Sequence, residues 1–93
     1  MAKFPSGKIY VTRGVNDEMA ETAGFALFVR QSLGRHLSGG DWGDVSKEDR
    51  AENEFSLNKR LRLFSVYKNG ERDIWIITEA DRAATTVLFP SEY

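Results

Sequence analysis

Cysteine is absent from this chain of 93 residues, and the only histidine is His36. Without cysteine there is no disulfide, no thiolate ligand for zinc and no cysteine nucleophile. A single histidine excludes metal sites built from several imidazoles, and His36 has no assignable partner for acid–base catalysis. The longest hydrophobic run, residues 74–77, is far shorter than the roughly 20 residues that cross a bilayer. These absences argue against an enzyme and against a membrane-spanning protein.

Neither sign of charge dominates, because 13 lysine and arginine residues face 14 aspartate and glutamate residues. A net charge of −1 exerts no overall attraction on nucleic acid or on an anionic membrane. Residues 1–8 carry charge with no apolar segment after them, so they do not have the pattern of a signal peptide. We therefore expect a cytoplasmic protein, since a secreted chain of this size usually needs covalent staples.

The N-terminal half predicts a strand followed by a long helix. Alternating β-branched and aromatic side chains predict the strand over residues 8–15. Asn16, which two acids follow, predicts a helix start, and an apolar stripe at helical spacing continues over residues 17–37. Two glycines at residues 39–40 predict the end of this helix.

The C-terminal half predicts a shorter helix and three more strands. Ser46 and Asp49 have the spacing of a capping box, and the helix after Ser46 has only a thin apolar face, so we expect it on the surface of the domain. An Asn-Gly pair is a strong hairpin signal between the first two of these strands. The strands are predicted over residues 62–68, 73–79 and 85–89.

These elements predict an α+β fold with the order β-α-α-β-β-β, forming a single domain over residues 1–93. We expect an antiparallel sheet of about four strands, in which the last three form a meander and the first joins at an edge. The long helix should pack on the face that carries Phe64, Val66, Trp75, Ile77, Val87 and Phe89. The opposite face, which the short helix or a partner must cover, would carry Ile74, Ile76 and Leu88.

Acidic residues concentrate between residues 41 and 54, where six acids face two bases and give a local charge of −4. Such a patch resembles nucleic-acid phosphates to a basic partner and steers association over about a Debye length. A solvated helix whose first turn favours acids explains the same charges. The candidate partner-binding residues are Asp41, Trp42, Asp44, Glu48, Asp49, Glu52 and Phe28.

Two of these candidates are aromatic and allow two interpretations. Trp42 either fills the core between helix and sheet or stands exposed as an interface hot spot. Phe28 lies off the main helical stripe and offers the same choice. The acids Asp41, Asp44 and Glu48 lack the spacing of a calcium loop, so we expect no metal. The sequence shows neither a nucleotide-binding loop nor a nucleophile with its base, so we also expect no cofactor and no catalytic residue.

Two other groups of residues suggest different functions. An alternative nucleic-acid-binding surface would consist of Arg13, Lys59, Arg60 and Arg62. These cations have no aromatic stacking partners close by in the sequence, so the signal is weak. A small hydrolytic site would consist of Glu79, Asp81 and Arg82, although a tight turn explains the same residues.

Four stretches of the chain carry a resemblance: VTRGVN at residues 11–16, GDWGD at 40–44, IWIITEADR at 74–82 and TTVLFPSEY at 85–93. They resemble a family of small bacterial proteins that plasmids, prophages and other mobile elements carry. The resemblance covers almost the whole chain and implies a genetic setting. Small proteins in that setting often bind host defence machinery, some of them as anti-CRISPR inhibitors.

The leading hypothesis is a non-enzymatic protein that binds and modulates or inhibits a host protein or ribonucleoprotein complex. An anti-CRISPR-type inhibitor of a nucleic-acid-guided defence nuclease is one form of this hypothesis. We expect a monomer or a weak homodimer that needs no membrane. The alternative is a small nucleic-acid-binding accessory protein.

Overall fold

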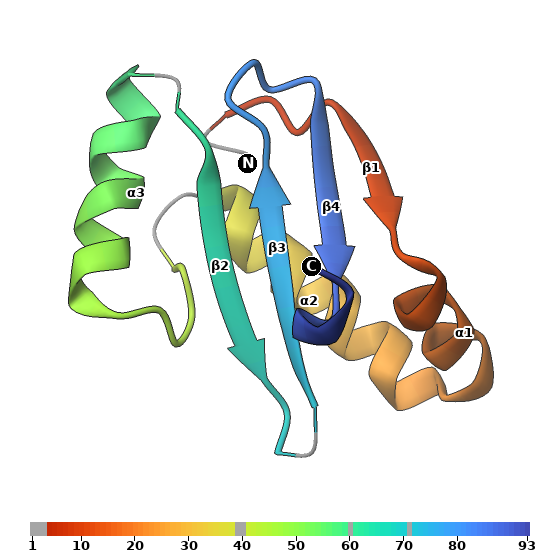
Figure 1. Cartoon of the computed structure of the whole chain (residues 1–93). Coiled ribbons are helices and arrows are strands. Elements are labelled where there is room, and N and C mark those ends of the chain that lie inside the picture. Colours follow the sequence, from red (N-terminus) through yellow and green to blue (C-terminus); the bar gives the residue numbers. More distant parts are fainter. Residues whose placement is uncertain (1–3, 39–40, 60, 71) are drawn as a thin grey trace.

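The computed structural model of the chain describes residues 4–38, 41–59, 61–70 and 72–93. Within them, a four-stranded sheet combines with three α-helices in an α+β fold (Figure 1). The strands are β1 (Lys8–Val11), β2 (Leu63–Lys68), β3 (Asp73–Thr78) and β4 (Ala84–Leu88). The helices are α1 (Arg13–Glu21), α2 (Ala23–Ser38) and α3 (Lys47–Lys59), and a 3₁₀ helix, η1 (Pro90–Glu92), follows β4.

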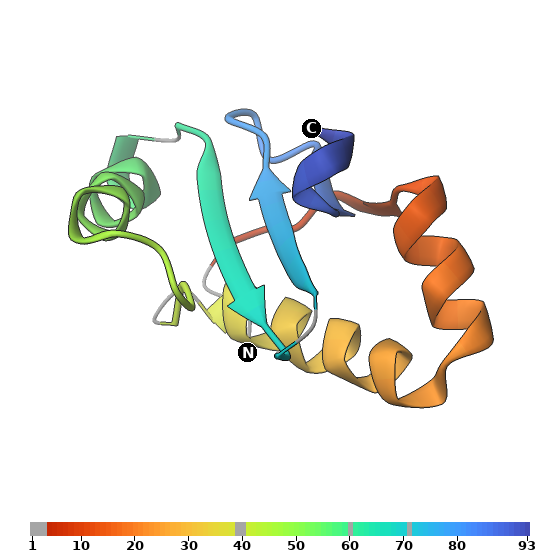
Figure 2. The same ribbon diagram turned by 60° about the horizontal axis from the view of Figure 1, so that its bottom comes forward.

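The sheet has the strand order β1-β4-β3-β2, and its last three strands form the antiparallel meander that the sequence predicts. The first strand lies at an edge, which is also confirmed. It runs parallel to β4, however, so the prediction of an antiparallel sheet was wrong and the sheet is mixed. The reason is that β1 leads into helices that return beneath the sheet, and no hairpin sets its direction (Figure 2).

Two helices replace the single long helix predicted over residues 17–37. They meet at Thr22, whose backbone is extended (φ −131°, ψ 109°), and α1 begins at Arg13, well before the predicted start. Asn16 is therefore inside α1 and is not its cap. The carboxylate of Glu92 instead accepts hydrogen bonds from the Gly14 N–H (2.9 Å) and the Thr12 hydroxyl (2.5 Å) at the start of α1. The predicted helix end at residues 39–40 lies outside the described residues.

One face of the sheet packs against α1 and α2, and we call it the covered face. Its core is a cluster of buried side chains: Val15, Phe25, Val29, Tyr67, Ile74, Ile76, Val87 and Phe89. The prediction placed Val87 and Phe89 correctly but put Ile74 and Ile76 on the wrong face. Four consecutive residues of β3, residues 74–77, are apolar, so the alternation in this strand does not distinguish its two sides.

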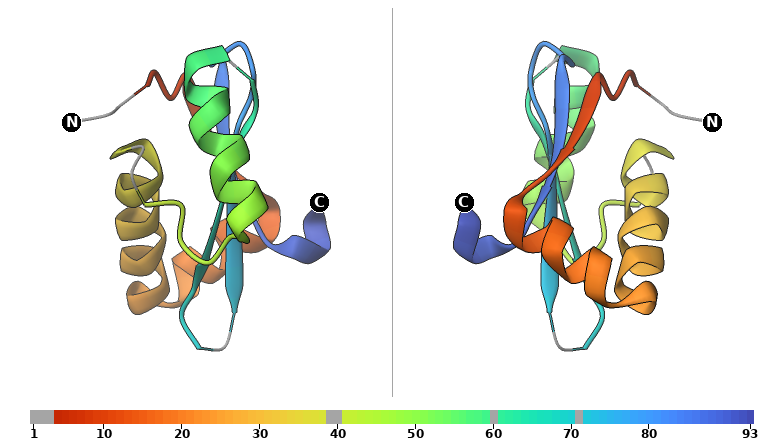
Figure 3. Two further views of the ribbon diagram at one scale, coloured as in Figure 1. Left: turned by 90° about the vertical axis from the view of Figure 1, so that its left-hand side faces the viewer. Right: turned by 90° about the vertical axis from the view of Figure 1, so that its right-hand side faces the viewer.

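The opposite face, which we call the open face, carries Phe64, Val66, Trp75, Ile77 and Leu88. The register makes this clear, because Phe64 lies opposite Ile77 and Val66 lies opposite Trp75. Viewed along the plane of the sheet, α2 lies on one side, whereas η1 lies on the other (Figure 3). The prediction that the long helix covers Phe64, Val66, Trp75 and Ile77 was therefore wrong. The prediction that Leu88 lies on the opposite face from Val87 is confirmed.

Helix α3 lies beside β2 and closes that edge of the sheet (Figure 1). The Asn53 amide donates to the Phe64 carbonyl (2.5 Å), and the Phe64 N–H donates to the Asn53 side-chain oxygen (3.0 Å). Further along β2, Val66 exchanges backbone hydrogen bonds with Trp42 (3.2 Å) and Asp44 (2.7 Å). These contacts satisfy backbone groups that an open edge would offer to other chains. The predicted cap is confirmed, since the Asp49 N–H donates to the Ser46 hydroxyl (3.1 Å).

A buried polar network crosses the covered face around His36. The imidazole Nδ1 lies 2.6 Å from the Ser65 hydroxyl, and Nε2 lies 2.9 Å from the Thr78 hydroxyl. Thr78 in turn contacts the Thr85 hydroxyl (2.8 Å). Burial, assisted by the charge of Arg82, lowers the pKa of His36 to about 3. The histidine is therefore a neutral, hydrogen-bonded core residue at physiological pH.

Candidate binding pocket

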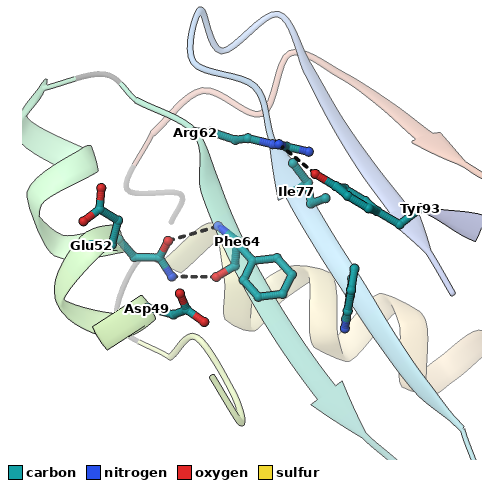
Figure 4. Close-up of a pocket in the computed structure, with 8 residues that line it drawn as sticks. Asp49, Glu52, Arg62, Phe64, Ile77 and Tyr93 are labelled. Atoms are coloured by element: carbon teal, nitrogen blue, oxygen red, sulfur yellow. Dashed lines mark hydrogen bonds between the residues drawn. The ribbon is translucent and has the colours of Figure 1, made fainter. Parts of the chain in front are cut away.

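A pocket of about 330 Å³ lies on the open face of the sheet (Figure 4). Helix α3 supplies one side of it, β2 and β3 supply the floor, and the residue after η1 supplies the far side. Its lining residues are Asp49, Glu52, Asn53, Arg62, Phe64, Trp75, Ile77 and Tyr93. The pocket therefore combines residues that are far apart in the sequence and that the sheet register brings together.

Three aromatic rings form a continuous wall in this pocket. The rings of Phe64 and Trp75 meet edge to face, with centroids 5.2 Å apart, and Trp75 meets Tyr93 in the same way at 5.5 Å. Phe64 and Trp75 are only partly buried, and Tyr93 is 70 % exposed. The open face therefore presents aromatic surface to solvent.

Two carboxylates from α3 form the acidic rim of the pocket, which we define as Asp49 and Glu52. Residues three and four apart share one side of a helix. Asp49 therefore lies on the same side of α3 as Glu52, three residues later, and as Asn53, four residues later. Because Asn53 is bonded to the backbone of Phe64, it holds this side of α3 against β2. Within the described part of the chain, neither rim carboxylate accepts a hydrogen bond or forms an ion pair.

Arg62 occupies the opposite end of the pocket and already has a partner. Its guanidinium donates to the Tyr93 hydroxyl (3.1 Å) and lies 5.5 Å from the centre of the Tyr93 ring. Figure 4 shows its side chain reaching over Ile77 toward Tyr93. The pocket thus has an occupied basic end and an acidic rim that faces solvent.

Trp42 is not an exposed hot spot, so that one of its two interpretations is wrong. It is fully buried, it packs with Phe4 and Leu63, and its indole N–H donates to the Glu54 carboxylate (2.7 Å). Phe28 is also partly buried, since it packs on the core beside Phe25. Both aromatics therefore stabilise the interior, as the other interpretation of each one stated.

The predicted acids divide into three groups in the structure. Asp41 is paired with Arg35 through two hydrogen bonds (2.6 and 2.8 Å), which lower the pKa of its carboxyl group. Asp44 and Glu48 are exposed outside the pocket. Only Asp49 and Glu52 line it.

The aromatic wall was not predicted as part of a site. The sequence predicts Phe64 and Trp75 as core residues, because large apolar side chains in strands usually face a helix. One signal was available: apolar residues occupy both faces of β3, so one face had to remain partly uncovered or meet a partner. Tyr93 carried no signal, since its place depends on the turn at η1.

The alternative nucleic-acid-binding residues are not brought together. Arg13 begins α1 next to β1, whereas Lys59 ends α3 next to β2, and these strands are opposite edges of the sheet (Figure 1). Arg62 is engaged by Tyr93, and Arg60 lies outside the described residues. The described members of the set therefore form no continuous basic surface.

The residues of the suggested hydrolytic site form a structural turn. Arg82 has a positive φ of 61° and is 5 % exposed. Its guanidinium donates to the carbonyls of Leu61 (2.6 Å), Ser56 (3.0 Å) and Glu79 (3.1 Å). The Asp81 carboxylate accepts from the Ala83 N–H (2.9 Å). These contacts support the interpretation of a tight turn, which Arg82 joins to the end of α3.

Three further observations bear on the site. Among the described residues, no group of three or more histidines, aspartates or glutamates is arranged to hold a metal ion. None of the helices in the described ranges is long and apolar enough to span a membrane. Comparison of the chain with protein-family models, with curated proteins and with solved structures finds no match.

Proposed function

We propose that this protein is a binding module that engages a positively charged segment of a partner protein through α3 and the adjacent pocket. The observation that supports the proposal most strongly is the acidic rim, whose two carboxylates lack partners within the described residues and lie beside partly exposed aromatic rings. Exposed aromatic surface next to unpaired charge is typical of protein contact sites. A basic segment would satisfy both features.

Charge on α3 would guide the approach of such a partner. Glu48, Asp49 and Glu52 are all exposed, and we call these three residues the acidic patch. A local field of one sign raises the rate of encounter with an oppositely charged segment, even when the whole molecule is nearly neutral. The proposed interaction should therefore weaken with salt.

The proposal is of binding without catalysis. Histidine is the most common general base in enzymes. The only histidine of this chain, His36, is buried on the covered face, where its two ring nitrogens contact Ser65 and Thr78. Among the described residues, the pocket lining contains no serine, threonine or lysine beside its carboxylates. Its composition suits recognition of a cation.

The resemblance to proteins of mobile elements suggests the class of partner. We propose a host protein or ribonucleoprotein complex, such as a nucleic-acid-guided defence nuclease. Such complexes carry basic grooves for nucleic acid, and the acidic patch has the charge that would compete for them. Inhibition of a defence nuclease in the presence of this protein is the corresponding activity assay.

A peptide titration tests the proposal without knowledge of the natural partner. The probe is an acetylated, amidated peptide of alternating glycine and lysine, and its glutamate counterpart is the control. We expect the lysine peptide to bind and to weaken about tenfold in the triple variant Glu48→Gln, Asp49→Asn and Glu52→Gln. We also expect the glutamate peptide not to bind.

A second triple variant shows whether the position of the removed negative charges matters or only their number. Asp17→Asn, Glu21→Gln and Glu79→Gln change the net charge equally at exposed positions outside α3 and outside the pocket lining. This variant should retain the affinity of the natural sequence for the lysine peptide. Equal weakening in both triple variants, or no binding at all, would overturn the proposal.

A further inference from the structure

The volume of the pocket limits what it can hold. At about 330 Å³ it lies at the small end of ligand sites, which typically span roughly 300–1,000 Å³. It is large enough for one long side chain and too small for a folded surface element. A partner that docks on α3 would therefore insert a single residue.

The lining of the pocket selects the chemistry of that residue. The acidic rim requires a cation, and the Phe64–Trp75 wall favours a flat group that packs against aromatic surface. An arginine guanidinium meets both conditions, because it donates to carboxylates within its plane and stacks through its faces. A lysine ammonium is a compact, strongly hydrated charge that gains less from the wall.

The chain itself contains a complete example of this arrangement. Arg35 donates to the Asp41 carboxylate through two hydrogen bonds (2.6 and 2.8 Å) while its guanidinium lies 4.7 Å from the centre of the Tyr67 ring. The pocket is likewise lined by carboxylates and aromatic rings, but no arginine of the described chain pairs with the rim. Arg62 is held by Tyr93 at the other end and would direct a second cation toward α3.

We infer that the pocket receives one arginine side chain from the partner's basic segment, with the guanidinium paired to Asp49 and Glu52 and packed on Phe64 and Trp75. This inference rests on the proposed function, since the surrounding basic segment provides the approach. It adds a specific anchor to an otherwise general attraction between charges. The anchor would account for selection of one basic segment over another.

The test compares three peptides of alternating glycine and lysine that differ only at the central position, which is lysine, arginine or citrulline. Citrulline keeps the planar shape of arginine and lacks its charge. We expect the arginine peptide to bind about fivefold more tightly than the lysine peptide, and the citrulline peptide to bind more weakly than both. Titration calorimetry at low and at physiological ionic strength measures each affinity.

Matched variants inside and outside the pocket identify the residues that cause the preference for arginine. The pair Asp49→Asn and Glu52→Gln, and separately Trp75→Leu, should bring the arginine and lysine affinities to the same value. The control pair Asp44→Asn and Glu48→Gln removes the same charge outside the pocket. It should weaken all three peptides equally and leave the preference unchanged. The acid variants are surface changes, so they test the inference even if Trp75→Leu disturbs the fold.

The outcomes distinguish this inference from the proposed function. Equal, salt-dependent binding of the lysine and arginine peptides by the natural sequence would overturn the arginine pocket and leave the binding module standing. Failure of every peptide to bind would overturn the proposed function. In that case the arginine pocket is tested by a titration with N-acetyl-arginine amide that is monitored through the NMR signal of the Trp75 indole. A change in its chemical shift supports an arginine site in the pocket, and no change overturns it.

Discussion

The two faces of the sheet are built from alternate residues of the same strands, yet they differ in what covers them. On the covered face, Ile74, Ile76 and Val87 are fully buried beneath helices. On the open face, Ile77 and Leu88 are buried, but Phe64 and Trp75 remain partly exposed in the lining of a pocket. Under the proposed function, the covered face stabilises the fold, while the partly exposed aromatic part of the open face is available for binding.

The difference originates in α3. This helix has little apolar surface of its own, so it gains little by packing flat on the open face. Hydrogen bonds from Asn53 to the backbone of Phe64 hold it beside β2 instead. A polar helix attached to an edge leaves the aromatic face uncovered and places acids at its border.

Substitutions of two adjacent residues of β3, one on each face, test the difference between the faces most directly. Ile76→Ala should lower the free energy of unfolding by about 3 kcal/mol, because it leaves a cavity in a packed core. Trp75→Leu should lower it by only about 1 kcal/mol, since that side chain is partly exposed and keeps an apolar replacement. Urea denaturation measures both values. Equal losses would show that the open face is as much a core as the covered one.

The pH dependence of stability tests the buried histidine of the covered face. Its pKa is about 3 in the folded protein and near 6.5 when exposed, so below pH 6.5 the unfolded chain binds the extra proton. Stability should therefore fall as the pH falls, by about 1.4 kcal/mol per pH unit from pH 6.5 toward 3.

In the upper part of this pH range, the change in the free energy of unfolding reports on His36 and not on the carboxyl groups. Asp41 and Glu92 also have lowered pKa values, but their stabilisation is lost only near or below their ordinary values of 3.8 and 4.5. Urea denaturation above that range, with an NMR titration of the imidazole, is the measurement. A constant free energy of unfolding between pH 6.5 and about 5 would contradict a neutral, buried imidazole.

The connection between α3 and the sheet should have a smaller effect on stability. Asn53→Ala removes two hydrogen bonds to the backbone of Phe64 and should cost about 2 kcal/mol. It also exposes an edge strand, so self-association should increase in sedimentation experiments. The exposed Asn16, which is not a cap in this structure, is the control, and Asn16→Ala should change stability by less than about 0.5 kcal/mol. A comparable loss in both variants would argue against the role of Asn53.

Features encoded by neighbouring residues could be predicted from the sequence. The three C-terminal strands were predicted to within two residues, and Ser46 caps α3 as expected, because strand alternation and caps depend on adjacent side chains. The start of α1 was missed because its capping carboxylate, Glu92, comes from the other end of the chain. The assignment of faces failed at β3, where both sides are apolar, and at β2, which pairs with it.

The candidate site was predicted only in part for the same reason. Asp49 and Glu52 were found because charge density is visible in a sequence. The aromatic wall was missed because the exposure of Phe64 and Trp75 depends on where α3 stops short of covering them. Trp42 kept two interpretations, because nothing local shows that Glu54 accepts its indole N–H across the turn into α3.

The central claim, that binding belongs to the open face and stability to the covered face, is tested most directly by the pair Asp49→Asn and Glu52→Gln. Both the free energy of unfolding and the affinity for the arginine-bearing peptide are measured on the same preparation. We predict that stability changes by less than about 0.5 kcal/mol while affinity falls about tenfold. Unchanged affinity in this folded variant would contradict the account.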